Sequence, residues 1–368
     1  MALALEEKTR RESTKLAVID CDIHNIPPSE EALTQYFPER WRRHHETFGK
    51  RNYPGAHYPR ANRSAARADA WPPSGALPGS DLEFLQAQLL DAWDMEYGIL
   101  SPLTFGSQTN FEYCAARAQA LNEWQIAEWT DPEPRLRASM IVPYEDGELA
   151  AAEIRRLGGH PGFAQVLTLV HTLEPLGRRK YWPLYEAAVE HDLAIAIHFG
   201  GAGGVPITGA GWGSFYLEEH AGMPTPFQAQ VTSLVCEGVF DRFPTLKVVL
   251  IEGGFGWLAS LMWRLDRTWK MLRAEVPHLR RLPSEYIRDH FWVTTQPMEE
   301  PPQPEQFLQL LDHMGMDDRI MFATDYPHWD FDAPDRAIPA KLEPELERRI
   351  MAENARALYG LPAPVESH

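Results

Sequence analysis

The sequence predicts an α/β protein with a (β/α)8 barrel, the TIM-barrel fold, as one domain. Short apolar runs of strand-like composition alternate with amphipathic, helix-like stretches, a pattern typical of βα units in a parallel sheet. The runs number eight, which is the number of strands that closes such a barrel. No glycine-rich phosphate loop follows the first run, which argues against an open, doubly wound sheet.

The expected strands are defined by their apolar, β-branched composition, and each is followed by a segment that is polar or helix-like. Helix-like segments include CAARAQALNEWQIAEW, GELAAAEIRRLGG and PLYEAAVEHD, which carry apolar residues at helical spacing. In chain order, the strands are expected at residues 16–24, 96–101, 138–144, 163–170, 193–200, 246–254, 291–297 and 319–327.

Two long insertions interrupt the alternation, at residues 25–80 and 200–230. Each follows the carboxyl end of an expected strand, which is the end where barrel active sites lie. The first is rich in Arg, His, Pro, Gly and Trp, and the second begins with GGAGGVPITGAGWGS. Long loops in this position usually form lids or pocket walls, and we expect the same here.

Composition limits the classes of partner. The net charge of -17 argues against a nucleic-acid or anionic-membrane partner, since both require clustered positive charge. The amino-terminal residues are charged throughout and lack the apolar core of a signal peptide, and no apolar run has the length of a membrane span. The three cysteines are widely separated, so neither a disulfide framework nor a CxxC metal site is expected. We therefore expect a cytoplasmic protein.

The first expected strand contains the run VIDCDIH, in which charge occurs where a buried strand should be apolar. Because side chains alternate between faces, Asp20, Asp22 and His24 point to the same side. Buried charges are costly unless they are paired, protonated or bound to a metal ion. The run therefore indicates either a structural ion pair or part of a site.

Ionisable residues also occur at the carboxyl ends of other expected strands. The fifth strand ends near His198, the sixth near Glu252 and the eighth near Asp325, while His171 follows the fourth. In a barrel these ends converge on one mouth, however far apart they are in sequence. Imidazole and carboxylate are ligands for Zn, Mn or Fe(II), and a metal ion in such a site polarises substrate oxygens or activates water.

Four segments together resemble one known superfamily. The D-x-H of the first strand, IAIHFG, FPTLKVVLIEGGFGWL and FATDYPHWD are similar to the amidohydrolase superfamily. The resemblance is closest to the amidohydrolase-related branch that includes aminocarboxymuconate-semialdehyde decarboxylase and the resorcylate-type decarboxylases. It extends over residues 16–330. It implies a homo-oligomer, and a hetero-oligomer with a related chain is the alternative.

The resemblance also implies site roles, residue by residue. Asp22 and His24 match the metal-binding pair of the first strand, and His198 matches the ligand of the fifth. Asp325 matches the strand-eight aspartate that contacts the metal and serves as acid or base. Glu252 stands where decarboxylases of this branch usually carry a histidine that binds substrate, so it is a candidate catalytic residue and a candidate further metal ligand.

Three features refine the expected site. The first ligand is aspartate at 22, where many members have histidine or glutamate. The fourth strand has no lysine, which excludes the carbamylated-lysine bridge of binuclear members and favours a single divalent ion, with Zn first and Mn or Fe as alternatives. His328, His220 and Trp212 are candidate substrate-binding residues, and His198 and Asp325 are the other candidate catalytic residues.

Three functions are consistent with these residues. The first is a metal-dependent enzyme that hydrolyses or decarboxylates a small carboxylate or amide, cyclic or aromatic, with Asp325 as base or proton donor. The second is an iron-dependent oxygenase component, in which Glu252 and His220 help to hold a second ion. The third is a non-catalytic, metal-binding partner subunit.

Overall fold

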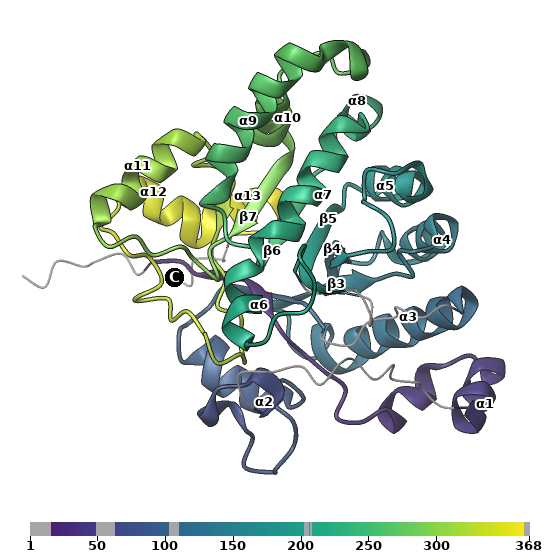
Figure 1. Cartoon of the computed structure of the whole chain (residues 1–368). Helices are drawn as coiled ribbons and strands as arrows, with labels where there is room; N and C mark the ends of the chain where they lie inside the picture. The colour runs from purple at the N-terminus through teal and green to yellow at the C-terminus, as the bar shows by residue number, and fades with distance from the viewer. Residues whose placement is uncertain (1–15, 49–62, 103–109, 202–205, 207, 364–368) are drawn as a thin grey trace, which may run out of the picture.

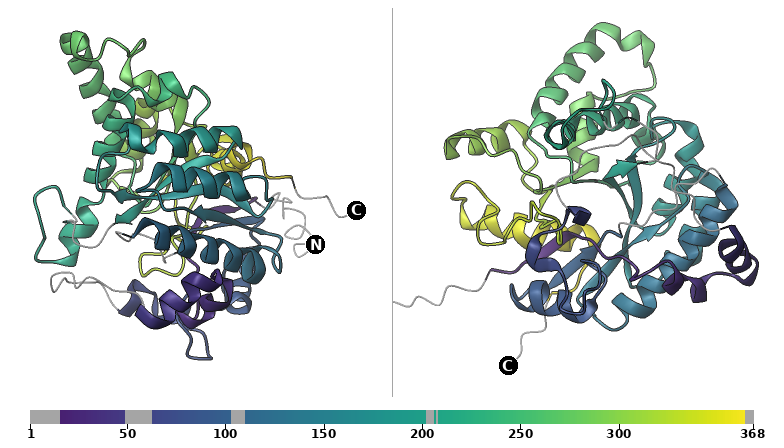
Figure 2. Two further views of the ribbon diagram at one scale, coloured as in Figure 1. Left: turned by 90° about the vertical axis from the view of Figure 1, so that its right-hand side faces the viewer. Right: turned by 60° about the horizontal axis from the view of Figure 1, so that its bottom comes forward.

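The computed structural model describes residues 16–48, 63–102, 110–201, 206 and 208–363. One eight-stranded sheet runs in the order β1 to β8, with every neighbouring pair parallel, which confirms the predicted barrel. The strands lie at the centre and helices surround them (Figure 1, and Figure 2, right). The strands are β1 (Ile19–Ile23), β2 (Tyr97–Leu100), β3 (Leu136–Ile141), β4 (Phe163–His171), β5 (Ala194–Gly201), β6 (Val248–Ile251), β7 (Phe291–Thr294) and β8 (Ile320–Met321).

Hydrogen bonds between β1 and the segment that follows β8 close the barrel. The amide of Cys21 donates to the carbonyl of Phe322 at 2.9 Å, and the amide of His24 donates to the carbonyl of Tyr326 at 2.7 Å. β8 itself is shorter than the expected run of residues 319–327, because the chain beyond Met321 leaves regular strand geometry: Asp325 has a φ of 60°. The closure therefore places the end of the first strand against the polar segment after the last.

Helices connect the strands, and several begin at side-chain caps. The carboxylate of Asp146 accepts hydrogen bonds from the amides of Glu148 and Leu149 at the start of α4, as a preferred N-cap residue does. The helices are α1 (Glu39–Phe48), α2 (Leu82–Leu85), α3 (Phe111–Gln125), α4 (Gly147–Leu157), α5 (Trp182–Glu190), α6 (Tyr216–Gly222), α7 (Pro224–Cys236), α8 (Val239–Arg242), α9 (Trp257–Leu272), α10 (Pro283–His290), α11 (Pro304–Met314), α12 (Pro344–Arg348) and α13 (Asn354–Tyr359).

Alternation along β5 separates two hydrophobic clusters. Ala194 and Ala196 belong to one cluster, and Ile195 and Ile197 belong to the other. Val249 of β6 shares the cluster of the two alanines. Because alternate residues of a strand face opposite sides, His198 faces the same side as the alanines, toward the barrel axis.

Both expected insertions lie partly outside the described residues. In the first, the described parts include α1, and Glu30 is tied to α3 by a bidentate pair with the buried Arg117, at 2.7 and 2.9 Å. In the second, residues 202–205 and 207 are not described, and α6 follows them. α7 begins at Pro224, before the expected end of the insertion at residue 230, and packs on β4 and α9. Within the described ranges, no helix is both long enough and apolar enough to cross a membrane.

Glu133 provides a pH-dependent contribution to stability. Its side chain is nearly buried and accepts hydrogen bonds from the amide and guanidinium of Arg135 and from Gln86. Burial alone would raise the pKa of Glu133, but these donors outweigh it and lower the pKa to about 2. Because the folded pKa lies below the ordinary value, the stabilisation is complete above about pH 4.5 and is lost as pH falls toward 2.

We therefore expect Glu133→Gln to destabilise the protein at pH 7 by about 1 kcal/mol, or about 1–3 °C in Tm. The difference from the unmodified chain should shrink in urea titrations repeated at pH 4 and pH 3. A difference that stays constant over this range would contradict the assignment.

Candidate metal centre

The ends of three strands bring four of the predicted residues together. Asp22 and His24 come from β1, His198 from β5, and Asp325 from the segment after β8, and all four are at most 2% exposed. His24 Nε2 lies 2.8 Å from Asp325 Oδ1 and 3.8 Å from Asp22 Oδ2. His198 Nε2 lies 3.3 Å from the same Asp22 oxygen. Asp22 and Asp325, which are 303 positions apart in sequence, thus meet at the barrel mouth.

Backbone carbonyls fix the orientation of both imidazoles. His24 Nδ1 lies 2.6 Å from the carbonyl oxygen of Ser101, and His198 Nδ1 lies 2.6 Å from that of Phe199. A carbonyl only accepts, so each Nδ1 carries the proton that it donates. In the neutral ring, Nε2 is then an unprotonated donor atom for a metal ion, as in most metal-ligating histidines.

Several atoms of the cluster are buried without a hydrogen-bond partner among the described residues. They are both carboxylate oxygens of Asp22, Nε2 of His198 and Oδ2 of Asp325. Unpaired buried polar atoms are rare in proteins, and bound ions are one of their ordinary explanations. The donor set of carboxylates and imidazoles suits Zn, Mn or Fe(II).

Two overlapping groups have the spacing that one ion requires. One ligand atom from each of Asp22, His24 and His198 lies within 4.8 Å of the others, and the same holds for His24, Asp325 and His328. His24 belongs to both groups. The residues therefore fit a divalent ion at the carboxyl ends of β1, β5 and β8.

Asp20 shares the inward face of β1 with Asp22 and His24, but unlike Asp22 it has hydrogen-bond partners for both carboxylate oxygens. Its Oδ1 accepts hydrogen bonds from the amides of Asp22 at 3.1 Å and Thr324 at 3.0 Å, and its Oδ2 accepts from the Thr324 hydroxyl. Asp20 therefore supports the barrel through hydrogen bonds. It ties β1 to the segment that carries Asp325.

We expect Asp20→Ala to destabilise the protein by about 3–5 kcal/mol, because two buried amides and a hydroxyl would lose their acceptor. Asp20→Asn is the matched control: its amide oxygen still accepts hydrogen bonds, so the loss should be clearly smaller. Urea unfolding of both variants measures the difference. Equal losses would show that the carboxylate acts through its charge instead.

Asp325 and His328 form a close pair. His328 Nδ1 lies 2.7 Å from Asp325 Oδ1, the oxygen that His24 also contacts. Burial alone would raise the pKa of Asp325. The charges and hydrogen bonds of His328 and His24 outweigh burial and hold this pKa well below its ordinary value. Burial likewise lowers the pKa of His328, and the Asp325 carboxylate outweighs this effect and raises it to about 9. The pair therefore holds one proton near neutral pH. The φ of 60° at Asp325 is unusual for a residue with a side chain and is typical of functional sites.

Glu252 lies beside the cluster but on another edge of His198. Its Oε2 is 3.4 Å from His198 Nδ1, the nitrogen that faces the carbonyl, and it belongs to neither group with metal-site spacing. Burial, followed by the charges of Asp325 and Asp22, raises the pKa of Glu252 well above its ordinary value. The raised pKa favours the protonated carboxyl of Glu252, which repels an anion less than a carboxylate does.

The turn after β6 holds Glu252 in place. Its φ of 61° redirects the side chain at the strand end. A Cβ on Gly253 would lie 2.7 Å from the ring of Phe227, so only glycine fits between this turn and α7. The Glu299 carboxylate accepts hydrogen bonds from the amides of residues 255 and 256, which holds the turn that leads into α9.

The predicted substrate-binding residues lie at different places. His328 is part of the cluster. His220 of α6 contacts Asp330, at 2.8 Å between Nε2 and Oδ2, rather than the four central residues. Trp212 is 41% exposed and is not brought to the cluster. His171 packs against Phe199, and within the described chain its buried Nε2 has no hydrogen-bond partner.

Two residues of this region were missed in the sequence. Asp330 accepts hydrogen bonds from His220 and, at 2.9 Å, from Gln296 Nε2. Gln296 is 1% exposed, and its Oε1 has no hydrogen-bond partner in the described chain. The signal for both was available: Gln296 ends the expected seventh strand, and Asp330 follows the eighth.

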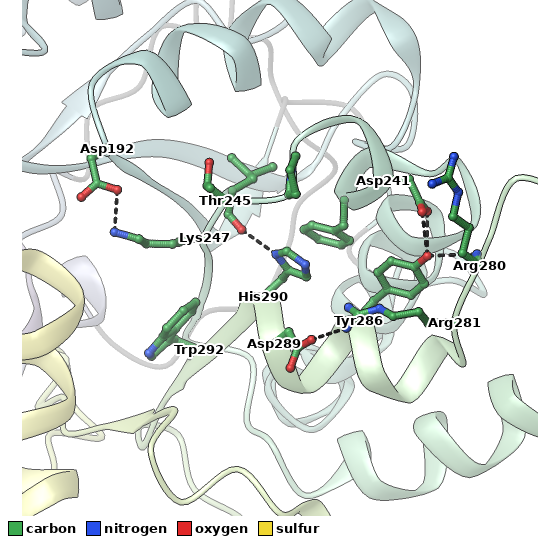
Figure 3. Close-up of a pocket in the computed structure, with 13 residues that line it drawn as sticks. Asp192, Asp241, Thr245, Lys247, Arg280, Arg281, Tyr286, Asp289, His290 and Trp292 are labelled. Carbon is green, nitrogen blue, oxygen red and sulfur yellow. Dashed lines mark hydrogen bonds and ion pairs between the residues drawn. The ribbon is translucent and has the colours of Figure 1, made fainter.

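A separate hollow of about 720 Å³ lies at the other end of the barrel (Figure 3). Lys247 and His290, which line it, directly precede β6 and β7, so it opens at the amino ends of the strands. Its charges pair with one another, as in the contacts of Lys247 with Asp192 at 2.7 Å and of Arg281 with Asp289 at 2.6 Å. This hollow is not part of the metal centre.

The fold and the cluster define a class: metal-dependent enzymes on a parallel eight-stranded barrel. Comparison with known proteins identifies the family. Residues 19–361 match the amidohydrolase family profile. The chain therefore belongs to the amidohydrolase family, as a metal-dependent hydrolase or carboxy-lyase.

Curated relatives and solved structures agree with this assignment. Gamma-resorcylate decarboxylase of Polaromonas sp. is 26% identical over 320 residues, 78% of this chain and 93% of the relative. The 2-amino-3-carboxymuconate-6-semialdehyde decarboxylase of Dictyostelium discoideum is 26% identical over 255 residues, 66% of each chain. Among solved structures, a dihydroxybenzoic acid decarboxylase of Polaromonas sp. JS666, with bound manganese and 2-nitroresorcinol, has a TM-score of 0.65 at 20% identity over 94% of this chain and 97% of that chain. An amidohydrolase of Mycobacterium avium subsp. paratuberculosis K-10 has a TM-score of 0.70 at 22% identity over 94% and 99%.

Proposed function

We propose that this protein removes the carboxyl group of a small aromatic carboxylate that carries a hydroxyl group on its ring. The observation that carries the proposal is the convergence of Asp22, His24, His198 and Asp325, with unpaired ligand atoms turned toward one another. The names of relatives and of solved neighbours indicate the substrate class, since they include decarboxylases of gamma-resorcylate, 2,6-dihydroxybenzoate and 5-carboxyvanillate.

The proposed metal ligands are Asp22, His24, His198 and Asp325. A bound divalent ion would supply a Lewis acid that holds and polarises the substrate oxygens. The neutral Nε2 atoms and the unpaired oxygens of Asp22 are the groups that would accept it, and binding would displace any proton on His198, whose pKa the Asp22 carboxylate raises against the effect of burial. Manganese is the proposed ion, because two solved neighbours contain it; zinc, favoured by the sequence, is the alternative.

Proton transfer is assigned to the Asp325–His328 pair. When the bond between the ring carbon and the carboxyl carbon breaks, the electron pair stays on the ring carbon and carbon dioxide leaves. The proton shared by Asp325 and His328 then bonds to that carbon, and water restores the proton of the pair. The 2.7 Å contact between the two side chains supports this role.

Glu252 bears on the choice between decarboxylation and hydrolysis. A charged carboxylate here would repel a substrate carboxylate, and the raised pKa of Glu252 removes that objection. Its carboxyl group would donate a hydrogen bond to the substrate, in place of the histidine that the family resemblance implies. Hydrolysis at the same centre is the second candidate, favoured by the presence of a carboxyl group rather than an imidazole at this position.

Activity and metal content, measured together, test the proposal. Protein purified without added metal would be analysed for its elements and then assayed with 2,6-dihydroxybenzoate and 5-carboxyvanillate, with and without oxygen. About one equivalent of manganese or zinc, with equal amounts of carbon dioxide and phenol formed in the absence of oxygen, supports it. Two equivalents including iron, with a requirement for oxygen, would support the oxygenase alternative. No carbon dioxide from either substrate, together with turnover of an aromatic amide by the same preparation, would support hydrolysis.

The proposal extends to the second insertion, which follows β5. The described part of the second insertion carries His220 and Trp212, and we assign this segment to a wall of the substrate pocket. Location in the cytoplasm remains a prediction from the sequence.

A further inference from the structure

One carboxylate near the metal centre has an oxygen that the chain fills and an oxygen that it leaves open. Asp330 lies on the same segment after β8 as Asp325. Its Oδ2 accepts hydrogen bonds from His220 Nε2 at 2.8 Å and from Gln296 Nε2 at 2.9 Å. Within the described chain no donor reaches Oδ1, and the side chain is 15% exposed. Asp330 is thus held in place through one oxygen and keeps an acceptor on the other.

The two donors of Asp330 come from different parts of the fold. His220 belongs to α6, in the second insertion, and Gln296 follows the end of β7. Gln296 is 1% exposed, and its carbonyl accepts a hydrogen bond from the Thr294 hydroxyl at 3.4 Å. The same hydroxyl accepts a hydrogen bond from the amide of Glu252 at 3.3 Å. Asp330 is therefore fixed both to the insertion and to the barrel wall that carries Glu252.

Electrostatic effects place Asp330 near the metal centre. Burial, followed by the charges of Asp325 and Asp22, raises the pKa of Glu252, and the Asp330 carboxylate adds to these effects. Burial lowers the pKa of His328, and the Asp330 carboxylate adds to the effect of Asp325 that outweighs burial. Asp330 belongs to neither group with metal-site spacing. It therefore lies beside the centre without being one of its ligands.

Aromatic rings adjoin the open carboxylate. The ring of Trp329, the residue before Asp330, lies 5.5 Å from the ring of His220 and 6.2 Å from that of Tyr216. Trp329 is 43% exposed, so part of its surface is available to a ligand. Aromatic side chains with a few fixed polar groups are typical of sites for small aromatic molecules.

The chemistry of a carboxylate oxygen limits what it can bind. An ionised carboxylate accepts hydrogen bonds but donates none. Oδ1 of Asp330 therefore suits a ring hydroxyl, which carries a proton, and not a methoxy group or a second carboxylate. A site built to pair with a hydroxyl discriminates strongly against an analogue without one, because its own polar group is then left unpaired.

We propose that Asp330 selects the substrate by accepting, at Oδ1, a hydrogen bond from a second ring hydroxyl that the metal ion does not bind. The inference rests on the proposed function, which takes the carboxyl group of the substrate and an adjacent hydroxyl to lie at the metal. It narrows the substrate class to aromatic carboxylates with two ring hydroxyls. His220 and Gln296 act through Asp330, whose carboxylate they orient.

Binding of unreactive ligands tests this inference without turnover. In nitrophenols a nitro group replaces the carboxylate, so no carbon dioxide can be lost. The probes are 2-nitroresorcinol, 4-nitroresorcinol, nitrohydroquinone and 3-nitrocatechol, which place the second hydroxyl at each ring position in turn, and the methyl ether of that hydroxyl in each. Titration calorimetry with the manganese-loaded protein gives each Kd. At least one isomer should bind at least about ten-fold more tightly than its ether, as expected for a hydrogen bond to a charged group.

Asp330→Asn is the most informative variant, because His220 and Gln296 fix the orientation of the new amide. Both donate to the position of Oδ2, so the amide oxygen must occupy it and the amide nitrogen takes the place of Oδ1. The variant keeps the shape of the side chain and both contacts, but presents a donor instead of an acceptor. The preference for the hydroxyl over the ether should therefore disappear. If the ether were rejected only because of its size, the preference would remain.

Two further variants complete the test. Asp330→Ala should also abolish the preference, and Asp335→Asn, at a 61% exposed carboxylate on the same segment, should keep it. Far-ultraviolet circular dichroism checks that each variant is folded. Equal binding of hydroxyl and ether in every pair, no binding of any isomer, or a preference that Asp330→Asn retains would each overturn the inference. Carbon dioxide release is measured separately, so failure of the proposed function and failure of this inference give different results.

Discussion

Asp325→Asn is expected to lower the rate of carbon dioxide release at least about 10³-fold, within the range that removal of a general acid or base produces. Asparagine preserves the shape of the side chain but cannot share a proton with His328. The amide would still accept a hydrogen bond from His328 Nδ1, but it lacks the charge that raises the pKa of His328 and therefore keeps a proton on the pair near neutral pH. His24 would also lose its charged partner at 2.8 Å.

The metal should remain in this variant, because Asp22, His24 and His198 still have the spacing for one ion. We expect most of the metal of the unmodified protein by elemental analysis, and an unchanged far-ultraviolet circular dichroism spectrum. Asp335→Asn, at an exposed carboxylate on the same segment, is the control and should retain full activity. A rate within ten-fold of the unmodified enzyme would exclude Asp325 from proton transfer. Complete loss of metal would show instead that Asp325 acts mainly as a ligand.

Asp22→Ala is expected to abolish metal binding and the stability that metal confers. Asp22 Oδ2 approaches both imidazoles, at 3.3 Å from His198 Nε2 and 3.8 Å from His24 Nε2. Without it, no carboxylate faces His198 Nε2, and among the described residues no group that includes His198 keeps the spacing that one ion requires. At free metal one hundred times the Kd, a single bound ion stabilises the folded state by about 2.7 kcal/mol.

Unfolding in urea, with metal and with chelator, measures this effect. The unmodified protein should lose about 2–3 kcal/mol on chelation, and Asp22→Ala should lose almost nothing. Asp318→Ala, at an exposed carboxylate, is the control and should respond to chelation as the unmodified protein does. A variant that keeps its metal and its response to chelation would show that Asp22 is not a ligand.

Local sequence patterns predicted the barrel well. Eight expected strands correspond to the eight observed ones, and the helices after residues 110, 146 and 182 lie where apolar spacing predicted them. Apolar runs and amphipathic spacing are properties of neighbouring residues, and each strand of a parallel barrel is buried by helices that directly follow it. The largest difference is at β8, which ends at Met321 after two residues, and the segment that follows it contains the positive φ of Asp325. That segment donates hydrogen bonds to the Asp20 carboxylate and to the carbonyl of Asp22, which are remote in sequence.

The sequence also identified most of the cluster, because the ends of barrel strands must meet. Asp22, His24, His198 and Asp325 are each at or just beyond a strand end, so strand prediction was sufficient to group them. His220 and Trp212 lie on a segment between strands, and no local rule fixes its direction. The structure places His220 against Asp330 instead of the cluster.

The sequence by itself thus determined the barrel and the membership of its polar mouth, since both follow from strand order and from which residues end the strands. Only the tertiary structure decided what each polar group does there. Asp20 and Asp22 share one face of one strand, yet Asp20 is saturated with hydrogen bonds from Thr324 and Asp22, while both oxygens of Asp22 lack a partner in the described chain. The same holds for Glu252, whose pKa depends on charges from three other strands and segments. Hydrogen-bond partners and local fields come from residues remote in sequence, so they exist only once the barrel has closed.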